Sequence, residues 1–341
     1  MKSTLLTLST FLALAAAVGA QEINKAQLAV FGTLPEAWEN PENPITDAKV
    51  DLGRMLFYDA RLSKSHAISC NSCHGLDTFG VDGKAGSVGH KGHITGRNSP
   101  TVYNAAAHLA QFWDGRAPDV EAQAKGPVLA GGEMAAPSEK WVVDSLKSIP
   151  GYAPLFKAAF PDAKDAITYD NMAKAIGVFE RQLSTPGRFD EYLAGKDDAL
   201  SEQETRGLST FLATGCTTCH IGPAVGGLIY QKLGLVKPWP GLKDEGRSAV
   251  TGNEAEKGFF KVPSLRNIAE TGPYLHDGSI DDLGKLVSMM AEHQLGKTLT
   301  DGEVKDVVAF LGALTGEVDE DYIKEPTLPE SGPDTPKPDL N

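Results

Sequence analysis

Hydrophobic residues recur at helical spacing in several stretches of this chain of 341 residues. One clear stripe comprises Met172, Ile176, Phe179 and Leu183, since apolar positions three or four apart share one face of an α-helix. The same periodicity predicts helices over 138–149, 168–183, 281–295 and 300–314. Convincing alternation of apolar and polar residues, the pattern of a half-buried strand, is absent. The pattern therefore predicts a mainly α fold with long Gly-rich and Pro-rich loops.

Two further helices are predicted at matching places in the two halves of the chain. In the first half, an apolar stripe starts at Leu52 and reaches Phe57. In the second half, Ser201-x-x-Glu204 is a capping box that begins a helix, and Gly215 ends it. Each of these helices leads into a cysteine pair, which indicates a duplicated unit.

The cysteine pairs form two copies of Cys-x-x-Cys-His, and together they use all four cysteines of the chain. The copies are Cys70, Cys73 and His74, and Cys216, Cys219 and His220. Two thiols at this spacing can add to the two vinyl groups of a haem, and the adjacent histidine can then bind the iron. A zinc site is disfavoured because the pairs are 146 positions apart. A thiol redox pair needs no histidine in the same place twice. The motifs predict two covalent haem c groups.

Length and termini predict an exported protein of two domains. Residues 1–20 combine Lys2, an apolar run and a small-residue end, which is typical of a removable export signal. The remaining chain of about 320 residues exceeds the size at which one core stops growing. From Glu325 onward, five prolines in seventeen residues predict an extended or disordered tail. We expect a signal peptide at 1–20, an N-terminal haem domain at 21–185, a C-terminal haem domain at 186–320 and a tail at 321–341.

The net charge of the chain disfavours one class of binding partner. The formal net charge of −13 argues against nucleic acid as a partner, because nucleic-acid binding relies on Lys and Arg contacts with phosphates. No segment after the signal approaches the roughly 20 apolar residues that a spanning helix needs. Haem c is attached outside the cytoplasm in bacteria, so we expect the protein to work in the periplasm.

Candidate sixth ligands of the iron differ between the halves. His90 and His93 lie in a glycine-rich stretch, 80–96, which is poorly suited to hold one shape. A ligand carried on it could bind and then leave, but two incidental histidines on a surface loop would give the same pattern. Met289 and Met290 lie on a predicted helix about 70 residues after His220. A helical methionine is otherwise most often a core residue.

Several segments carry a resemblance to the bacterial dihaem cytochrome c peroxidases, spread over roughly residues 35–316. They are GRMLFYD at 53–59, GVDG at 80–83, GRNSPT at 96–101, QFWDGRA at 111–117, PSLRN at 263–267 and PYLHDG at 273–278. The resemblance implies two cytochrome c-like domains, each enclosing one haem c. It selects His90 as the removable ligand opposite His74, and Met290 as the partner of His220. It leaves His93 as a surface residue.

The same resemblance implies roles for residues that look ordinary by themselves. Glu133 matches the family's catalytic carboxylate, Gln123 is expected to line the peroxide pocket, and Trp113 matches the tryptophan between the two haems. Read alone, Glu133 would be a solvated glutamate and Trp113 a core residue. A calcium ion is also implied, with Asn98, Thr271 and Pro273 as matching ligands; amide and carbonyl oxygens suit this hard cation.

The resulting hypothesis is a periplasmic enzyme that reduces hydrogen peroxide to water. Because methionine ligation raises the potential of a haem, the C-terminal haem would accept electrons from a small donor, a cytochrome c or a copper protein. A homodimer is expected. Two other classes stay open: a dihaem electron carrier without enzymatic activity, and a related dihaem enzyme that uses peroxide to oxidise residues of another protein. The second carries a tyrosine where Met290 stands here.

Overall fold

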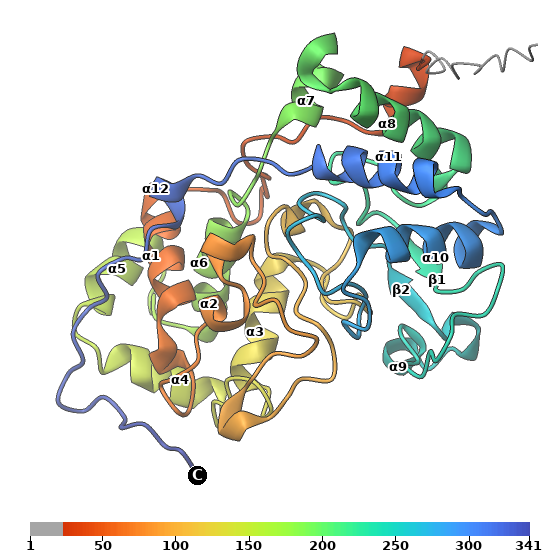
Figure 1. Cartoon of the computed structure of the whole chain (residues 1–341). Helices are drawn as coiled ribbons and strands as arrows, with labels where there is room; N and C mark the ends of the chain where they lie inside the picture. The colour runs from red at the N-terminus through yellow and green to blue at the C-terminus, as the bar shows by residue number, and fades with distance from the viewer. Residues whose placement is uncertain (1–22) are drawn as a thin grey trace, which may run out of the picture.

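The computed structural model describes residues 23–341, so the predicted export signal lies outside the described residues. The described chain forms two helical halves that lie side by side (Figure 1). A single antiparallel pair of short strands, β1 (Tyr230–Lys232) and β2 (Phe259–Lys261), is the only sheet named within the described residues. The prediction of a mainly α fold is confirmed.

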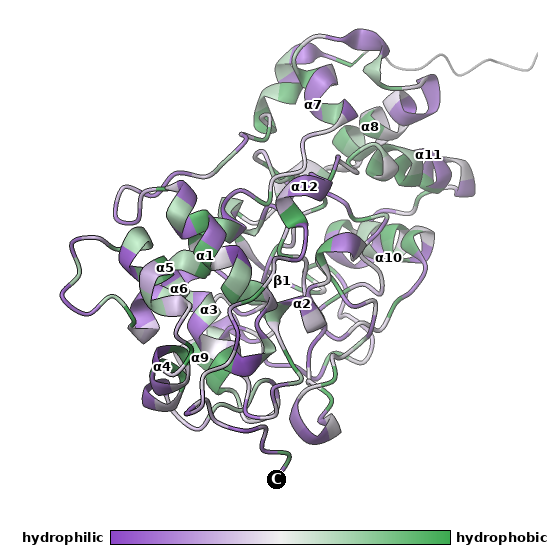
Figure 2. Cartoon of the chain, turned by 90° about the vertical axis from the view of Figure 1, so that its left-hand side faces the viewer, coloured by the Kyte–Doolittle hydropathy of each residue, from purple (hydrophilic) through white to green (hydrophobic). Residues whose placement is uncertain are grey.

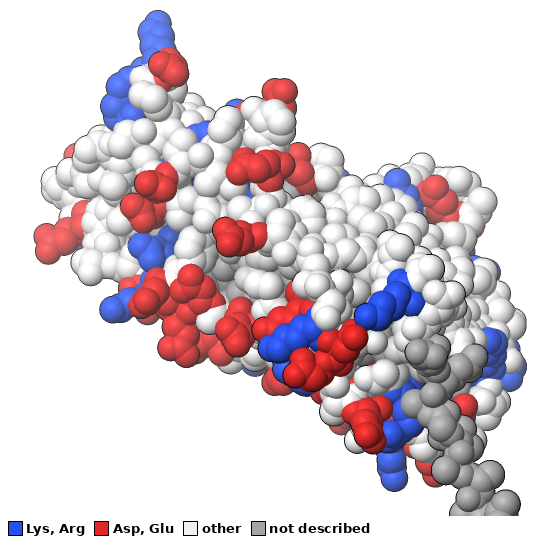
Figure 3. All heavy atoms as spheres, turned by 90° about the horizontal axis from the view of Figure 1, so that it is seen from above, with Lys and Arg blue, Asp and Glu red and all other residues white. Residues whose placement is uncertain are grey.

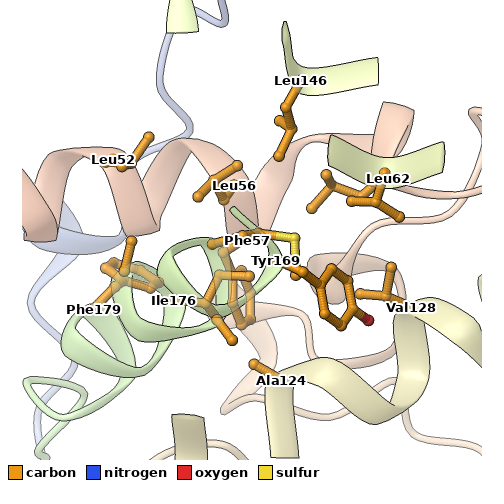
Figure 4. Packing of buried hydrophobic residues seen from close by; sticks show 14 of the residues in the cluster. Leu52, Leu56, Phe57, Leu62, Ala124, Val128, Leu146, Tyr169, Ile176 and Phe179 are labelled. Carbon is orange, nitrogen blue, oxygen red and sulfur yellow. The ribbon is translucent and has the colours of Figure 1, made fainter. Parts of the chain in front are cut away.

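The N-terminal half is built on two helices that pack against each other, α1 (Asp47–Tyr58) and α6 (Tyr169–Glu180). A side chain at Gly53 would collide with the carbonyl of Ala175, so glycine permits the close approach of these helices. Around this pair lie α2 (Cys70–Cys73), α3 (Val120–Leu129), α4 (Glu139–Lys147) and α5 (Tyr152–Ala159). Figure 4 shows Leu56, Phe57 and Ile176 meeting in this core, which also takes in side chains from α3 and α4.

The C-terminal half rests on α8 (Glu202–Thr214) packed against α11 (Asp301–Gly312). The predicted capping box at Ser201 starts α8, a second capping box at Thr300 starts α11, and Gly215 ends α8 with a φ of 92°. Along α8 and α11 the ribbon alternates between hydrophobic and hydrophilic residues (Figure 2). This half also contains α7 (Arg188–Leu193), α9 (Ser248–Thr251) and α10 (Leu283–Leu295).

The long predicted helices are confirmed as α4, α6, α10 and α11, within three residues at each end. Three helices longer than four residues had no clear signal in the sequence. The helix α3 contains Gly126 and Pro127, which break the usual pattern, and α5 is short. The helix α7 directly follows Gly187, at the start of the expected C-terminal domain, and its Phe189 is buried in the C-terminal core.

The connection between the halves is buried and tied to both sides. Thr185 is fully buried, and its Oγ1 accepts hydrogen bonds at 2.9 Å from Nδ2 of Asn104 in one half and Nδ2 of Asn267 in the other. Asn267 Oδ1 in turn accepts a hydrogen bond from the Gly316 amide at 3.0 Å. Buried amide side chains whose bonds are all made hold a fixed geometry. We therefore describe this junction as a rigid connection.

Both ends of the described chain cross to the opposite half (Figure 1). Near the N-terminus, the ring of Phe31 packs edge-on against Phe189 of the C-terminal core, with centroids 5.3 Å apart. At the other end, α12 (Glu320–Ile323) packs on the N-terminal core, where Tyr322 stacks on Phe179 at 5.1 Å. Residues 23–31 therefore contact the half to which the sequence did not assign them.

The proline-rich tail follows the surface of the N-terminal half as an extended chain. Arg61 Nη1 donates to the Pro329 carbonyl at 2.8 Å, and the Asp339 amide donates to the Lys64 carbonyl at 2.9 Å. Ser148 Oγ donates to Thr335 Oγ1 at 3.0 Å. Proline favours this extended backbone, and the side chains of the N-terminal half give it ordered contacts.

Within residues 23–341, no helix is both long and apolar enough to cross a membrane. Asp and Glu side chains recur across the face seen from above, with Lys and Arg between them (Figure 3). This distribution agrees with the acidic net charge of −13.

Candidate functional site: two chambers beside the cysteine motifs

The first motif forms a single helical turn, α2, held in place by local hydrogen bonds. The amide of Ser69 donates to Ser72 Oγ at 3.0 Å, which fixes the start of the turn. His74 follows it, and its Nδ1 lies 3.3 Å from the Gly80 carbonyl. A bond at Nδ1 orients the ring and leaves Nε2 as the nitrogen for a metal. Burial lowers the pKa of His74, which favours the neutral imidazole that metal binding needs.

The second motif repeats this arrangement. The helix α8 ends at Gly215, and Cys216–Thr218 forms a 3-10 turn that leads to His220. His220 Nδ1 lies 3.3 Å from the Val225 carbonyl, so the tautomer and the free Nε2 are set in the same way. Burial lowers the pKa of His220 to about 4. The two motifs thus present equivalent histidine ligands.

A chamber lies beside the first motif. Cys70, Cys73 and His74 line it together with Gln123 and Glu133. The wall also contains several polar and charged side chains among apolar ones: Arg97, Asn98, Gln111, Arg116, Glu180 and Asp244. The structure therefore brings the predicted catalytic side chains Gln123 and Glu133 to the predicted haem ligand His74.

Glu133 lies partly buried in this wall. Burial raises the pKa of its carboxyl, and the nearby Arg116 and His93 oppose that shift. A carboxyl whose pKa is raised toward neutrality can both accept and return a proton, which is what a general acid–base group does. His93 itself is exposed, as the sequence predicted, although its ring lies against Gly132 next to Glu133.

The second chamber has a different wall. Cys216, Cys219, His220 and Met290 line it, so the predicted sulfur ligand shares the chamber with the predicted histidine ligand. Most other wall residues are apolar: Phe211, Leu233, Phe260, Val262, Leu265, Ile268, Leu283, Leu286, Val287, Leu295 and Leu311. Met289 packs in the neighbouring hydrophobic cluster and is not part of this wall.

Trp113 is the one described residue that lines both chambers. Its Nε1 donates to the Asn98 carbonyl at 2.9 Å, and its ring meets His276 edge-on with centroids 6.4 Å apart. A hydrogen bond and a ring contact fix the indole between the two halves. The expected position of Trp113 between two haem sites agrees with this geometry.

His90 is not part of the wall of the first chamber. It is buried at 6% exposure, and its amide donates to the Glu133 carbonyl at 2.8 Å. Neither ring nitrogen of His90 has a hydrogen-bond partner among the described residues. Buried, unpartnered imidazole nitrogens are costly. In this conformation the structure does not bring His90 to His74, so its role as an iron ligand stays a prediction that requires the loop to move.

The residues predicted to bind calcium lie on two segments that adjoin. The Asn98 amide donates to the His276 carbonyl at 2.8 Å, which places Asn98 beside the loop that contains Thr271 and Pro273. Asn98 Nδ2 donates to the Lys84 carbonyl at 2.7 Å, so the side-chain oxygen is the atom left for a cation. No cluster of three or more His, Cys, Asp or Glu side chains suited to a metal occurs within residues 23–341. Calcium binding here would rest on amide and carbonyl oxygens.

Several polar residues around the chambers carried no signal in the sequence. Glu180 is buried in the first chamber, and burial raises its pKa to about 8. Lys261 lines the second chamber and contacts His108, which is 153 positions away in the chain. Asp244, from the C-terminal half, forms an ion pair with Arg97 of the N-terminal half at 2.7 Å. No local pattern predicts such contacts, because tertiary folding alone creates them.

The walls of both chambers fit a covalently attached haem. Each places two cysteines and one neutral, oriented histidine at the edge of a cavity lined by apolar and polar groups. The sulfur of Met290 lines the second chamber as a candidate sixth ligand, whereas His90 lies outside the first one. The cysteines and histidines of both chambers are therefore the donors that two haem c groups need.

Comparisons with known proteins agree with this geometry. The family described as di-haem cytochrome c peroxidase matches residues 47–198. The cytochrome c551 peroxidase of Pseudomonas aeruginosa is 43% identical over 91% of this chain and 90% of its own length. That of Nitrosomonas europaea is 47% identical over 84% of this chain and 85% of its own. A solved MauG-like protein associated with microbial copper homeostasis superposes with a TM-score of 0.76, at 28% identity, covering 86% of this chain and 97% of that one. The chain belongs to the di-haem cytochrome c peroxidase family.

Proposed function

We propose that this protein is a periplasmic cytochrome c peroxidase that reduces hydrogen peroxide to water with electrons from a small redox protein. The proposal rests on which residues line the two chambers. Glu133 and Gln123 line the same chamber as His74, and Trp113 lines both this chamber and the one with His220 and Met290. When bound, the two haem groups supply the iron that accepts electrons and the iron at which peroxide is reduced. The relatives named above are peroxidases by name, which supports this function.

Glu133 is the proposed proton carrier of the N-terminal chamber. Its carboxylate takes a proton from one oxygen of the peroxide, the one nearer His74. It then returns this proton to the other oxygen, which leaves as water. The raised pKa of Glu133 places the carboxyl closer to the pH at which both transfers are feasible. Gln123, on α3, is positioned to hold peroxide by hydrogen bonds from its amide.

Met290 and Trp113 define the proposed electron route. Methionine sulfur opposite His220 raises the reduction potential of the C-terminal site, so this site accepts electrons from the donor protein. Trp113 then spans the distance to the N-terminal chamber, because its indole lines both. The donor is a cytochrome c or a copper protein.

His90 is proposed as a ligand that binds opposite His74 in a resting form and withdraws before peroxide can bind. In the structure His90 lies outside the chamber wall, and its amide donates to the Glu133 carbonyl at 2.8 Å. This bond links the ligand loop to the main chain of the residue that carries the proposed catalytic carboxylate. A calcium ion bound by Asn98, Thr271 and Pro273 and a homodimeric assembly complete the proposal.

The test compares peroxide consumption by the fully oxidised and half-reduced protein, each with both haem groups attached. Rapid consumption by at least one form supports the function; its absence from both forms contradicts it and leaves a dihaem electron carrier. His90→Gly should remove any need for prior reduction, and an unchanged need would contradict the ligand role.

Met290 separates the peroxidase from the related enzymes that oxidise protein residues. The oxidised protein should show the Met-to-iron charge-transfer band, since Met290 lines the chamber with His220. A spectrum without this band would favour the second class, to which the MauG-like structure also points.

A further inference from the structure

Lys261 is a buried lysine without an acidic partner. It lies on β2 with 5% of its surface exposed, and it lines the second chamber. Its Nζ contacts Nδ1 of His108 at 3.0 Å, and no carboxylate among residues 23–341 lies within ion-pair distance of it. A buried ammonium without a counter-ion is expensive, so such a lysine loses its proton more easily than an exposed one. Burial lowers the pKa of Lys261 to about 7.

The groups that face Lys261 hold its amine neither permanently protonated nor permanently neutral. Burial and the lysine lower the pKa of His108, so His108 is a neutral hydrogen-bond acceptor. Asp114 attracts the proton of Lys261 from a distance. Tyr230 is opposite Lys261 in the β1–β2 pair, and His276 lines the same chamber; burial lowers the pKa of His276.

The negative charge of Asp114 is largely neutralised by other partners. Its carboxylate forms ion pairs with Arg97 and with Arg116, the latter at 3.0 Å. Asp114 therefore shifts the balance at Lys261 without fixing it. A charge change inside the C-terminal chamber can then decide whether the amine is protonated.

Lys261 also contacts the residue that joins the chambers. Its amide donates to the Trp113 carbonyl at 2.8 Å, while its side chain reaches His108 of the N-terminal half. One residue thus touches the wall of the C-terminal chamber, the bridging tryptophan and the other half of the molecule.

We propose that Lys261, hydrogen-bonded to His108, takes up the proton that accompanies the electron arriving at the His220/Met290 site. This rests on the proposed role of that site in electron entry. One electron from the donor protein lowers the oxidation state of the iron by one, and one proton from solvent forms the third N–H bond on Nζ of Lys261. The added negative and positive charges cancel, so the chamber keeps the same net charge. Buried charge is costly, and this compensation makes reduction easier.

The test is the reduction potential of the C-terminal haem between pH 5.5 and 9, measured by spectroelectrochemistry on the protein with both haem groups. In the unaltered protein the potential should fall as pH rises, by up to about 59 mV per pH unit, the value for one proton per electron. The protonated amine favours the reduced iron, so the high plateau lies at low pH.

Two substitutions fix Lys261 in opposite states. Lys261→Met keeps the length of the side chain and has no proton to gain, so its potential should be independent of pH and equal the high-pH plateau. Lys261→Arg stays charged throughout this range, so its potential should also be independent of pH but equal the low-pH plateau. A buried methionine suits the apolar wall, so this variant stays informative if the bulkier arginine does not fold. Retention of the original slope by Lys261→Met, or its absence from the unaltered protein, overturns the proposal.

Lys232→Met is the matched control, since Lys232 is exposed on β1 of the same sheet. It should keep the original slope, and loss of the slope in this control would contradict a specific role for Lys261. Peroxide consumption measured on the same samples separates the two proposals. If peroxide is not consumed yet Lys261→Met removes the slope, the peroxidase function fails and the proton role stands.

Discussion

The two chambers share one anchor and differ in nearly every other wall residue. In both, a Cys-x-x-Cys-His turn holds a buried histidine whose Nδ1 lies 3.3 Å from a main-chain carbonyl. The N-terminal wall adds arginine, glutamine and glutamate side chains, whereas the C-terminal wall adds leucine, valine and phenylalanine around Met290. A duplicated haem-binding turn therefore does not determine the chemistry; the surrounding wall does, by admitting or excluding groups that move protons.

The apolar chamber suits a site that accepts and passes on electrons. Its wall is mostly apolar, and Lys261 is the group in it that is proposed to take up a proton when an electron arrives. The polar chamber suits a reaction that consumes protons, and two of its acids, Glu133 and Glu180, have raised pKa values through burial. Four changes can break or sharpen this contrast.

The largest effect is expected from Glu133→Gln, which removes the proposed proton carrier and keeps the size of the side chain. Peroxide consumption should fall about 10²–10⁴-fold, the usual contribution of general acid–base catalysis. The measurement is stopped-flow peroxide consumption by half-reduced protein. Glu139→Gln, at an exposed position at the start of α4, is the control and should keep full activity. Loss of less than tenfold in Glu133→Gln would assign the proton transfer to another group.

Glu180→Gln should change how stability depends on pH. The pKa of Glu180 is raised from 4.5 to about 8 by burial, so the unfolded chain releases this proton at lower pH than the folded protein does. The folded state therefore loses stability as pH rises between these values, by up to about 1.4 kcal/mol per pH unit. The variant should be more stable than the original at pH 8 and similar to it near pH 4.5. Thermal unfolding midpoints across this range test it, and parallel pH curves for the two proteins would contradict it.

Met290→His should lower the potential of the C-terminal haem. The decrease should be on the order of 0.1 V, within the range of about 0.8 V over which axial ligands set haem potentials. The Met-to-iron charge-transfer band should vanish as well. Met289→Leu changes the neighbouring methionine, which lies outside the chamber wall, and should preserve both potential and band. The opposite result would exchange the roles of the two methionines.

Removal of calcium is expected to have the smallest effect. The ion would join Asn98, beside the N-terminal chamber, to a loop of the C-terminal half, so it stabilises the folded junction. At ten times its dissociation constant it should contribute about 1.4 kcal/mol, which a chelator would remove. Unfolding curves with and without calcium measure this, and Asn98→Ala should show no response to the ion. An equal response in this variant would show that calcium binds at another site.

The sequence was sufficient for features encoded by neighbouring residues. The haem motifs, the capping boxes at Ser201 and Thr300 and the pairing of Met290 with the second chamber follow from local spacing or from the family resemblance. The sequence did not indicate α7 behind Gly187, because Pro186 and Gly187 predict a break. The contact of Lys261 with His108 joins residues far apart in the chain, and neither residue type predicts the other.

Because each end of the chain packs on the opposite half, each half depends on the other to cover its core. The segment before Phe31 packs on the C-terminal core, and α12 with the tail packs on the N-terminal core. A break in the backbone near Thr185 would therefore leave two fragments that each still pack on the core of the other. Each half produced as a separate polypeptide would lack a segment that covers its own core, and co-expression of both fragments would be the way to recover a folded molecule.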